Sequence, residues 1–124
     1  MTNFLPLLSR DFILGCNPFG LSCLVGAGTR YPLFPHHQIA NIRNIELSGA
    51  VVGGPCDAKT YNDEHIHLDD VEFGSMSPSP VPADDSKDEV GVYHDVVEDY
   101  VTNEAAIDYT STFLLLTAFY TPEG

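Results

Sequence analysis

Residues 103–120 read NEAAIDYTSTFLLLTAFY and carry the clearest secondary-structure signal in the chain. Apolar residues recur there at helical spacing and cover most of the circumference that a helix would have. Asn103 or Thr102 can cap the first turn, and Pro122 and Gly124 can end the last one. The sequence therefore predicts one long helix over residues 103–120 that is buried on several sides. A chain of 124 residues offers such a helix too few packing partners.

The rest of the chain combines one further helix with long loops. A helix is predicted over residues 3–15, where apolar residues recur near helical spacing and Gly15 provides a stop. Residues 16–38 are rich in glycine and proline but contain interleaved apolar residues, which indicates an ordered loop. Residues 57–92 are the most polar part, and the prolines within residues 75–85 exclude a helix or a central strand there. The predicted fold class is therefore mainly α and loop-rich, with a polar loop at about 57–92.

The charge of the chain is strongly negative and unevenly distributed. Eighteen acidic residues face five basic ones, which gives a formal net charge of −13. Three arginines nearly balance two acids before residue 57, whereas residues 57–124 hold sixteen acids against Lys59 and Lys87. Such a surface repels nucleic acid and anionic membranes, so neither is an expected partner. It suits a neutral ligand, a cation or a metal ion, or it only keeps the protein soluble.

The cysteines and the amino-terminal residues exclude several further classes. Cys16, Cys23 and Cys56 are odd in number and lack CxxC spacing, so they define neither a zinc site nor a disulfide framework. We expect buried free thiols, and a Cys16–Cys23 pair stays open. No stretch reaches the roughly 20 apolar residues that cross a bilayer, and no signal-peptide pattern is present. The opening Met-Thr-Asn-Phe-Leu-Pro is typical of a protein interior, so we expect a fragment of a longer protein.

Four acids lie within ten residues, at Asp95, Glu98, Asp99 and Glu104. They can form a solvated face, a cation site or an acid/base site, and their spacing does not decide between these. Neighbouring negative charges and burial favour the protonated form that a proton donor needs. A position in the first turn of a helix favours the charged form instead, because the helix dipole stabilises an anion there.

Histidines supply two further candidate sites. His36 and His37 follow a glycine-rich loop, where a histidine can hydrogen-bond a ligand hydroxyl or stabilise charge. A packing or surface role is the alternative for both. His65 and His67 alternate among carboxylates and point to the same side of an extended segment, so they can hold a metal. No further pair of ligands supports that metal site, and a polar loop is the stronger interpretation.

Three blocks, taken together and in this order, resemble the C-terminal part of glycoside hydrolase family 9, the inverting endoglucanase and cellulase family. The first block is DFILGCNPFGLSCLVGAGTR at residues 11–30, followed by Pro35-His36-His37, and it resembles the histidine signature of the family. The second is SGAVVGGP at residues 48–55, which is similar to the family's Gly-Gly-Pro turn. The third is YHDVVEDYVTNEAA at residues 93–106, which resembles its Asp/Glu signature.

The resemblance implies roles for individual residues. Glu104 stands where the family has its general acid, Asp95 stands at the second acidic position, and His36 stands at the histidine that lines the sugar-binding cleft. Asp95 and Asp99 would keep Glu104 protonated or bind the sugar. The remaining substrate contacts implied by the resemblance are His37, Tyr100 and Arg30. Two departures from the family pattern are Gln38, where an arginine is usual, and Thr110-Ser111, where asparagine and a small residue are usual.

The resemblance also implies what surrounds these residues. Residues 1–124 would be the C-terminal part of a catalytic domain, about the last quarter of an (α/α)6 toroid of the six-hairpin glycosidase type, incomplete by itself. The family's catalytic base lies in an Asp pair near the start of the domain, and no block here matches it. We therefore expect an inverting hydrolase of β-1,4-glucan that is inactive as this piece alone.

Further expectations concern what the complete protein contacts. Its partners would be a β-glucan oligosaccharide or polysaccharide and the missing N-terminal portion of its own domain. The complete protein would be extracellular or periplasmic and need no cofactor, although calcium is possible. The alternatives are a non-catalytic carbohydrate-binding remnant of a truncated gene and an acidic calcium-binding interaction module.

Overall fold

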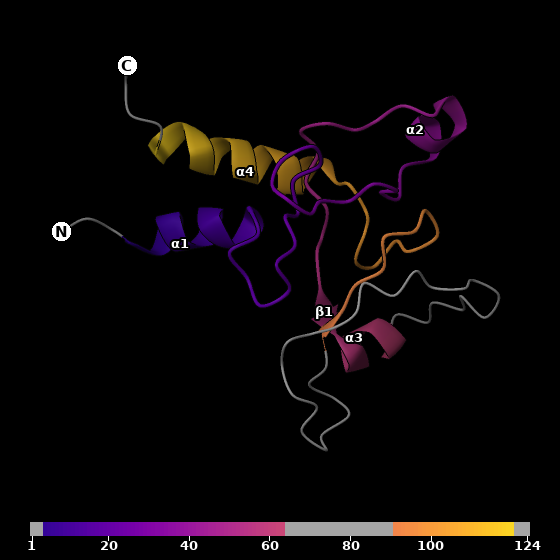
Figure 1. Ribbon diagram of the computed structural model, residues 1–124, viewed down its shortest axis with the longest axis horizontal. Helices are drawn as coiled ribbons and strands as arrows, with labels where there is room; N and C mark the ends of the chain where they lie inside the picture. The colour runs from indigo at the N-terminus through magenta and orange to yellow at the C-terminus, as the bar shows by residue number, and fades with distance from the viewer. Residues whose placement is uncertain (1–3, 64–90, 121–124) are drawn as a thin grey trace.

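The computed structural model describes residues 4–63 and 91–120. The helices and strands in chain order are α1 (Phe4–Ile13), α2 (Gln38–Arg43), β1 (Cys56–Asp57), α3 (Ala58–Asp63), β2 (Gly91–Val92) and α4 (Ile107–Tyr120). Figure 1 shows α1 and α4 side by side and antiparallel, with loops connecting them to α2 and to the β1–α3 unit. The described part is thus partly helical rather than mainly α, and it is rich in ordered loop, as the sequence predicted.

Helix α1 confirms the helix predicted over residues 3–15. Asn17 fastens the end of this helix to the loop that follows it. Its side-chain Nδ2 donates to the Phe12 carbonyl at 2.8 Å and to the Leu21 carbonyl at 2.7 Å, while its Oδ1 accepts from the Phe19 N–H at 3.0 Å. The predicted stop at Gly15 is also present, because Gly15 has a φ of 105°, which favours glycine.

Helix α4 begins at Ile107, four residues later than predicted. Neither Thr102 nor Asn103 caps it, because both side chains are fully buried and bonded elsewhere. The predicted burial on several sides is wrong for the described chain. Phe113 is 8% exposed, whereas Leu114 is 68% exposed and Phe119 is 75% exposed. The expectation that this helix has too few packing partners within the chain is confirmed.

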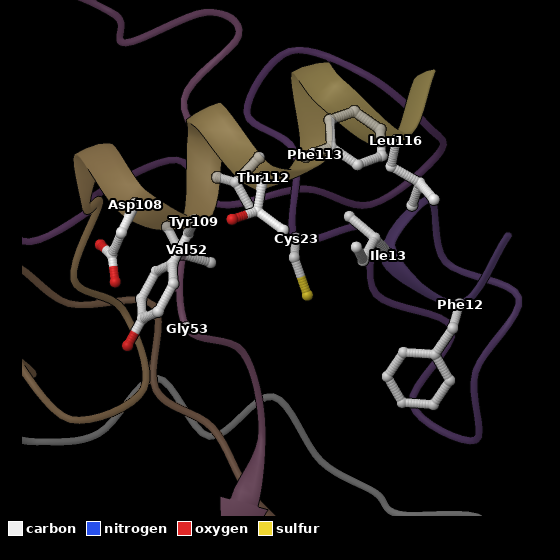
Figure 2. A pocket seen from close by; sticks show the side chains of 11 residues that line it. Phe12, Ile13, Cys23, Val52, Gly53, Asp108, Tyr109, Thr112, Phe113 and Leu116 are labelled. Atoms are coloured by element: carbon white, nitrogen blue, oxygen red, sulfur yellow. The ribbon is translucent and has the colours of Figure 1, made fainter. Parts of the chain in front are cut away.

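The core lies where the loop residues meet α4. Its buried members are Leu21, Cys23, Val25, Val51, Val52, Tyr93 and Phe113. Three of them come from the glycine-rich and proline-rich residues 16–38, so the prediction of an ordered loop is confirmed. A mostly apolar pocket of about 280 Å³ opens beside this core, between α1, α4 and residues 51–53 (Figure 2). The Cys23 thiol points into it, and Asp108 and Tyr109 of α4 lie at one end.

Backbone pairing joins the three sequence blocks into one irregular sheet-like layer. Leu24 pairs with Val51, Val52 pairs with Ala105, and Glu104 pairs with His36. Hydrogen bonds from the Val52 N–H to the Cys23 carbonyl at 3.0 Å and from the Gly53 N–H to the Glu104 carbonyl at 3.2 Å reinforce these pairs. The pairing explains the late start of α4, because Glu104 and Ala105 pair with neighbouring segments and cannot also be helical.

The short elements were not predicted. In α2, the left-handed residue Asn44 ends the helix with a φ of 50°. β1 pairs antiparallel with β2, with Cys56 opposite Val92 and Asp57 opposite Gly91. Helix α3 corrects the beginning of the predicted polar loop over 57–92. The Asp57 carboxylate stabilises its first turn, since it accepts from the Thr60 N–H at 2.8 Å and the Thr60 hydroxyl at 2.6 Å.

Other predictions have mixed outcomes. His65, His67 and residues 75–85 lie outside the described residues. The three cysteines are free, but Cys16 is exposed, Cys56 is partly buried and Cys23 alone is buried, where burial raises the pKa of its thiol. The open Cys16–Cys23 pair is therefore absent. Among residues 4–63 and 91–120, no helix is long and apolar enough to cross a membrane.

Candidate functional site

Glu104 lies on an extended segment between two others, three residues before α4. The His36 segment pairs with it on one side, and the Gly53 N–H donates to its carbonyl oxygen on the other. The residue itself is exposed. Its backbone is therefore fixed on both sides, whereas its carboxyl group faces solvent and can meet a ligand. Glu104 does not occupy the first turn of a helix, so the opposing helix-dipole effect expected from the sequence does not apply to it.

His36 is held beside Glu104 by its backbone and its ring. Its N–H donates to the Asn103 carbonyl at 2.8 Å, and its ring Nδ1 is bonded to the Val97 carbonyl oxygen. A carbonyl oxygen only accepts, so Nδ1 carries the proton, and Nε2 is the acceptor of the neutral ring. The edge-to-face contact with Tyr100, at 6.2 Å between ring centroids, further restrains the imidazole. His36 and Tyr100 thus form one aromatic unit next to Glu104.

Asp95 holds the turn that leads into His36. Its Oδ2 accepts from the Leu33 N–H and its Oδ1 accepts from the Phe34 N–H, each at 2.8 Å. The buried residue Pro35 then connects this turn to His36. Both oxygens of the carboxylate are therefore bonded to the backbone of the histidine loop, and the arrangement suits a positioning role.

Asp99 is 0% exposed and cannot bind a sugar in this structure. Its Oδ1 accepts from the N–H groups of Val101 and Thr102, each at 2.9 Å. Its Oδ2 accepts from the Thr102 hydroxyl at 2.6 Å and from Nδ1 of His94 at 3.2 Å. Burial opposes the charged form, but the hydrogen bonds from His94 and Thr102 outweigh it and hold the pKa of Asp99 below its ordinary value. This carboxylate therefore shapes the turn that leads to Glu104.

The four neighbouring acids do not share one role. Glu98 and Glu104 are exposed, Asp95 is half-buried and Asp99 is buried. Among residues 4–63 and 91–120, no three His, Cys, Asp or Glu side chains gather as possible metal ligands. The described geometry therefore gives no support to the interpretation of this cluster as a cation site.

Two buried tyrosines, Tyr61 and Tyr93, lie next to the site and were not among the site residues predicted from the sequence. The Tyr61 ring lies 5.0 Å from the His94 ring, and burial together with the Asp99 carboxylate raises the pKa of Tyr61. The Tyr93 hydroxyl donates to Oδ1 of Asn103 at 2.6 Å, and burial raises the pKa of Tyr93. Neither tyrosine stands in a spacing pattern that predicts these contacts, although Tyr93 opens the third sequence block.

The remaining candidate residues lie around this centre. His37 is the N-cap of α2, and its Nδ1 accepts from the Ala40 N–H at 3.2 Å. The same histidine lines a groove together with Ala105 and Ile107, next to Glu104. Arg30 is exposed on the glycine-rich loop, where its carbonyl accepts from the Ser22 N–H at 2.8 Å. The structure thus brings together Glu104, His36 and Tyr100 most directly, with Asp95 behind the histidine loop.

Comparison with known proteins identifies relatives for almost the whole chain. The model of glycosyl hydrolase family 9 matches residues 7–117. The chain is 34% identical to Endoglucanase 13 of Arabidopsis thaliana over 96 residues, which cover 57% of this chain and 20% of that protein. It is 36% identical to Endoglucanase 14 of the same plant over 98 residues, which cover 59% of this chain and 19% of that protein.

A bacterial relative covers more of the chain. The xyloglucan-specific endo-beta-1,4-glucanase BoGH9A of Bacteroides ovatus is 30% identical over 110 residues, which cover 87% of this chain and 16% of that protein. No solved structure matches the chain. The chain spans a fifth or less of the length of these curated relatives.

Proposed function

This chain belongs to glycosyl hydrolase family 9, and on that premise we propose that it supplies the general acid of an enzyme that cleaves β-1,4-glucan with inversion. One observation carries the proposal. The backbone of Glu104 is fixed between the His36 segment and Gly53, while Glu104 itself is exposed. A carboxyl group on a rigid backbone with solvent access is what a proton donor to a bound ligand requires.

In the proposed reaction, the Glu104 carboxyl protonates the glycosidic oxygen as the bond to the anomeric carbon breaks. A second carboxylate, acting as base, removes a proton from the water that attacks the opposite face of the sugar. In inverting enzymes the two carboxyl groups lie about 6.5–9.5 Å apart, which leaves room for that water. We assign no residue of this chain to the base. The activity is therefore proposed for the complete polypeptide, and residues 1–124 alone are expected to be inactive.

The neighbouring residues are proposed to bind and orient the sugar. Nε2 of His36 can accept a hydrogen bond from a sugar hydroxyl, because Nδ1 already donates to Val97. The ring of Tyr100, which is 43% exposed, offers an apolar face to a pyranose. Asp95 acts through the loop that carries His36. His37 and Arg30 stay proposed substrate contacts.

The surroundings of the site are part of the proposal. We place residues 1–124 in the C-terminal part of an (α/α)6 toroid whose other helices cover the apolar faces of α1 and α4. The exposed Leu8, Phe12, Leu114 and Phe119 support that placement, since large apolar groups favour removal from water. The complete protein is proposed to act outside the cytoplasm, in the extracellular or periplasmic space, on a glucan polymer or oligosaccharide.

The experiment that tests this function compares Glu104→Gln with Glu98→Gln in the complete polypeptide that the gene encodes. Both changes replace a carboxylate by an amide, and both residues are exposed. Glu104→Gln is expected to lower kcat on a soluble β-1,4-glucan by about 10²–10⁴-fold, the usual contribution of a general acid. Glu98→Gln should retain full activity. Proton NMR of the first product should show the inverted anomer.

Two results would contradict the proposal. Full activity of Glu104→Gln would show that Glu104 is not the general acid. A complete wild-type polypeptide that binds glucan without hydrolysing it would favour the non-catalytic carbohydrate-binding alternative.

A further inference from the structure

Asn103 lies directly before Glu104, and it is 0% exposed. Its Nδ2 donates to the Phe34 carbonyl at 2.7 Å and also lies 3.3 Å from the Val96 carbonyl and 3.4 Å from Oδ1 of Asp95. Its Oδ1 accepts from the Tyr93 hydroxyl at 2.6 Å. The side-chain amide therefore connects three parts of the chain that meet only in the folded state.

The same residue holds the His36 segment through its backbone. The Asn103 carbonyl accepts the His36 N–H at 2.8 Å, immediately before Glu104 in the chain. On the turn before His36, the Phe34 N–H is bonded to Asp95 and the Phe34 carbonyl is bonded to Asn103. Phe34 is thus held at both of its polar backbone groups. Asp95 supplies the acceptor and Asn103 supplies the donor.

We propose that Asn103 is a positioning residue whose side-chain amide fixes the His36 loop against the Glu104 segment. This inference rests on the proposed function, because it assigns Asn103 the task of keeping the acid and the histidine side by side. Only an amide fits all of the partners. Two carbonyl oxygens require N–H donors, and the Tyr93 hydroxyl requires an acceptor at the same time. A carboxylate would face the two carbonyl oxygens with no proton to donate, at a buried position where unmatched polar groups are costly.

The test compares Asn103→Asp with Asn17→Asp in the complete polypeptide. Asn17 is a matched control, because its Nδ2 also donates to two backbone carbonyls but lies at the end of α1. The first measurement is amide hydrogen exchange of His36, which needs no enzymatic activity. Asn103→Asp is expected to lower the protection of the His36 amide by about tenfold or more, in line with the loss of buried hydrogen bonds. Asn17→Asp should leave it unchanged.

The second measurement is the kinetics on a soluble β-1,4-glucan. Asn103→Asp is expected to lower kcat by about tenfold to a hundredfold with KM nearly unchanged, because a small misplacement of reacting groups has effects of that size. The ratio of its kcat to the wild-type kcat should rise as pH falls, since the introduced carboxyl regains one donor when protonated. Because protonation would also restore stability, the folded fraction is measured by circular dichroism at each pH and kcat is expressed per folded molecule. Asn17→Asp should keep the wild-type profile.

Two outcomes overturn the inference: unchanged His36 protection in Asn103→Asp, or lower protection with unchanged kcat. If Asn103→Asp does not fold, hydrogen exchange in the wild-type protein tests the inference instead. The side-chain NH₂ protons of Asn103 should exchange far more slowly than those of an exposed asparagine, and Tyr93→Phe should accelerate them. Fast exchange in the wild type overturns the inference. If the wild type hydrolyses no glucan, the proposed function fails, whereas the exchange data still test the structural role of Asn103 separately.

Discussion

The buried carboxylate of Asp99 gives a quantitative prediction. Replacing Asp99 by Ala removes the acceptor from the N–H groups of Val101 and Thr102, from the Thr102 hydroxyl and from the His94 ring. Each buried donor that is left without a partner costs about 1–3 kcal/mol. These costs are not additive, because the turn can relax and admit water. We therefore expect Asp99→Ala to lower the free energy of unfolding by about 3–5 kcal/mol, the range found when one partner of a buried charged network is removed.

The isosteric change Asp99→Asn should cost much less. The amide oxygen can still accept from the two backbone N–H groups, and the Thr102 hydroxyl can rotate to accept from the amide nitrogen. What is lost is the acceptor of the His94 ring, because the amide nitrogen takes the Oδ2 position, together with the negative charge that strengthens the remaining hydrogen bonds. Since hydrogen bonds to charged groups contribute about 1.5–3 kcal/mol and neutral ones about 1, we expect a loss of about 1–2 kcal/mol.

The assay is urea unfolding of the complete polypeptide, followed by far-ultraviolet circular dichroism. Residues 1–124 contain no tryptophan, so hydrogen exchange of the Thr102 amide serves as the probe specific to this turn. Glu98→Ala is the control, because Glu98 precedes Asp99 directly but is exposed. Its effect should stay within about 0.5 kcal/mol. If Asp99→Ala costs no more than Glu98→Ala, or if the Asn and Ala variants are equally destabilised, the account of this network is wrong.

Two further predictions follow from the same structure. Because the pKa of Asp99 is lower in the folded state than the ordinary value near 3.9, its charge contributes stability that is present above about pH 4 and is lost as pH falls through the folded pKa. Acid unfolding of Asp99→Asn should lack that component, and a profile identical to wild type contradicts the prediction. Gly54→Ala should cost about 2–4 kcal/mol in urea unfolding, since Gly54 has a φ of 83° and an added Cβ would lie 2.8 Å from Sγ of Cys23. Gly49→Ala, with a φ of 88° and open space around it, should cost only the backbone strain of about 1–2 kcal/mol, and an equal cost for both would exclude the clash.

Local patterns predicted the two long helices and failed at the start of α4. The periodicity of residues 107–120 is visible in the sequence, so the existence of the helix was predictable. Thr102 and Asn103 carry good capping side chains, but the Thr102 hydroxyl is bonded to Asp99 and the Asn103 amide is bonded to Phe34 and Tyr93. Glu104 and Ala105 pair with His36 and Val52, residues more than fifty positions away in the chain. A single sequence does not show such pairing, and for this reason the predicted helix began too early.

The candidate site was predictable in its residue types but not in its bonding. The order of the three blocks placed Glu104 and His36 in one family pattern, and the structure pairs their backbones. The roles of Asn103 and Asp99 depend on partners that the sequence does not identify. Asn103 donates to the Phe34 carbonyl across 69 positions, and both it and Asp99 are fully buried although their residue types are usually exposed. Burial of a polar side chain follows from its partners, and only the fold provides these.

The helices and the loops carry different tasks in this part of the protein. Helices α1 and α4 pack against each other and against the core, but neither contributes Glu104, His36 or Asp95. Those residues are held by backbone pairing and by the buried side chains of Asn103 and Asp99. Because hydrogen bonds to Asp95 and Asn103 join residues 33–34 to residues 95–103, the loss of either segment leaves polar groups of the other without partners. The geometry around Glu104 therefore depends on the polar loops, whereas the exposed apolar faces of the helices are free to pack against further parts of a larger domain.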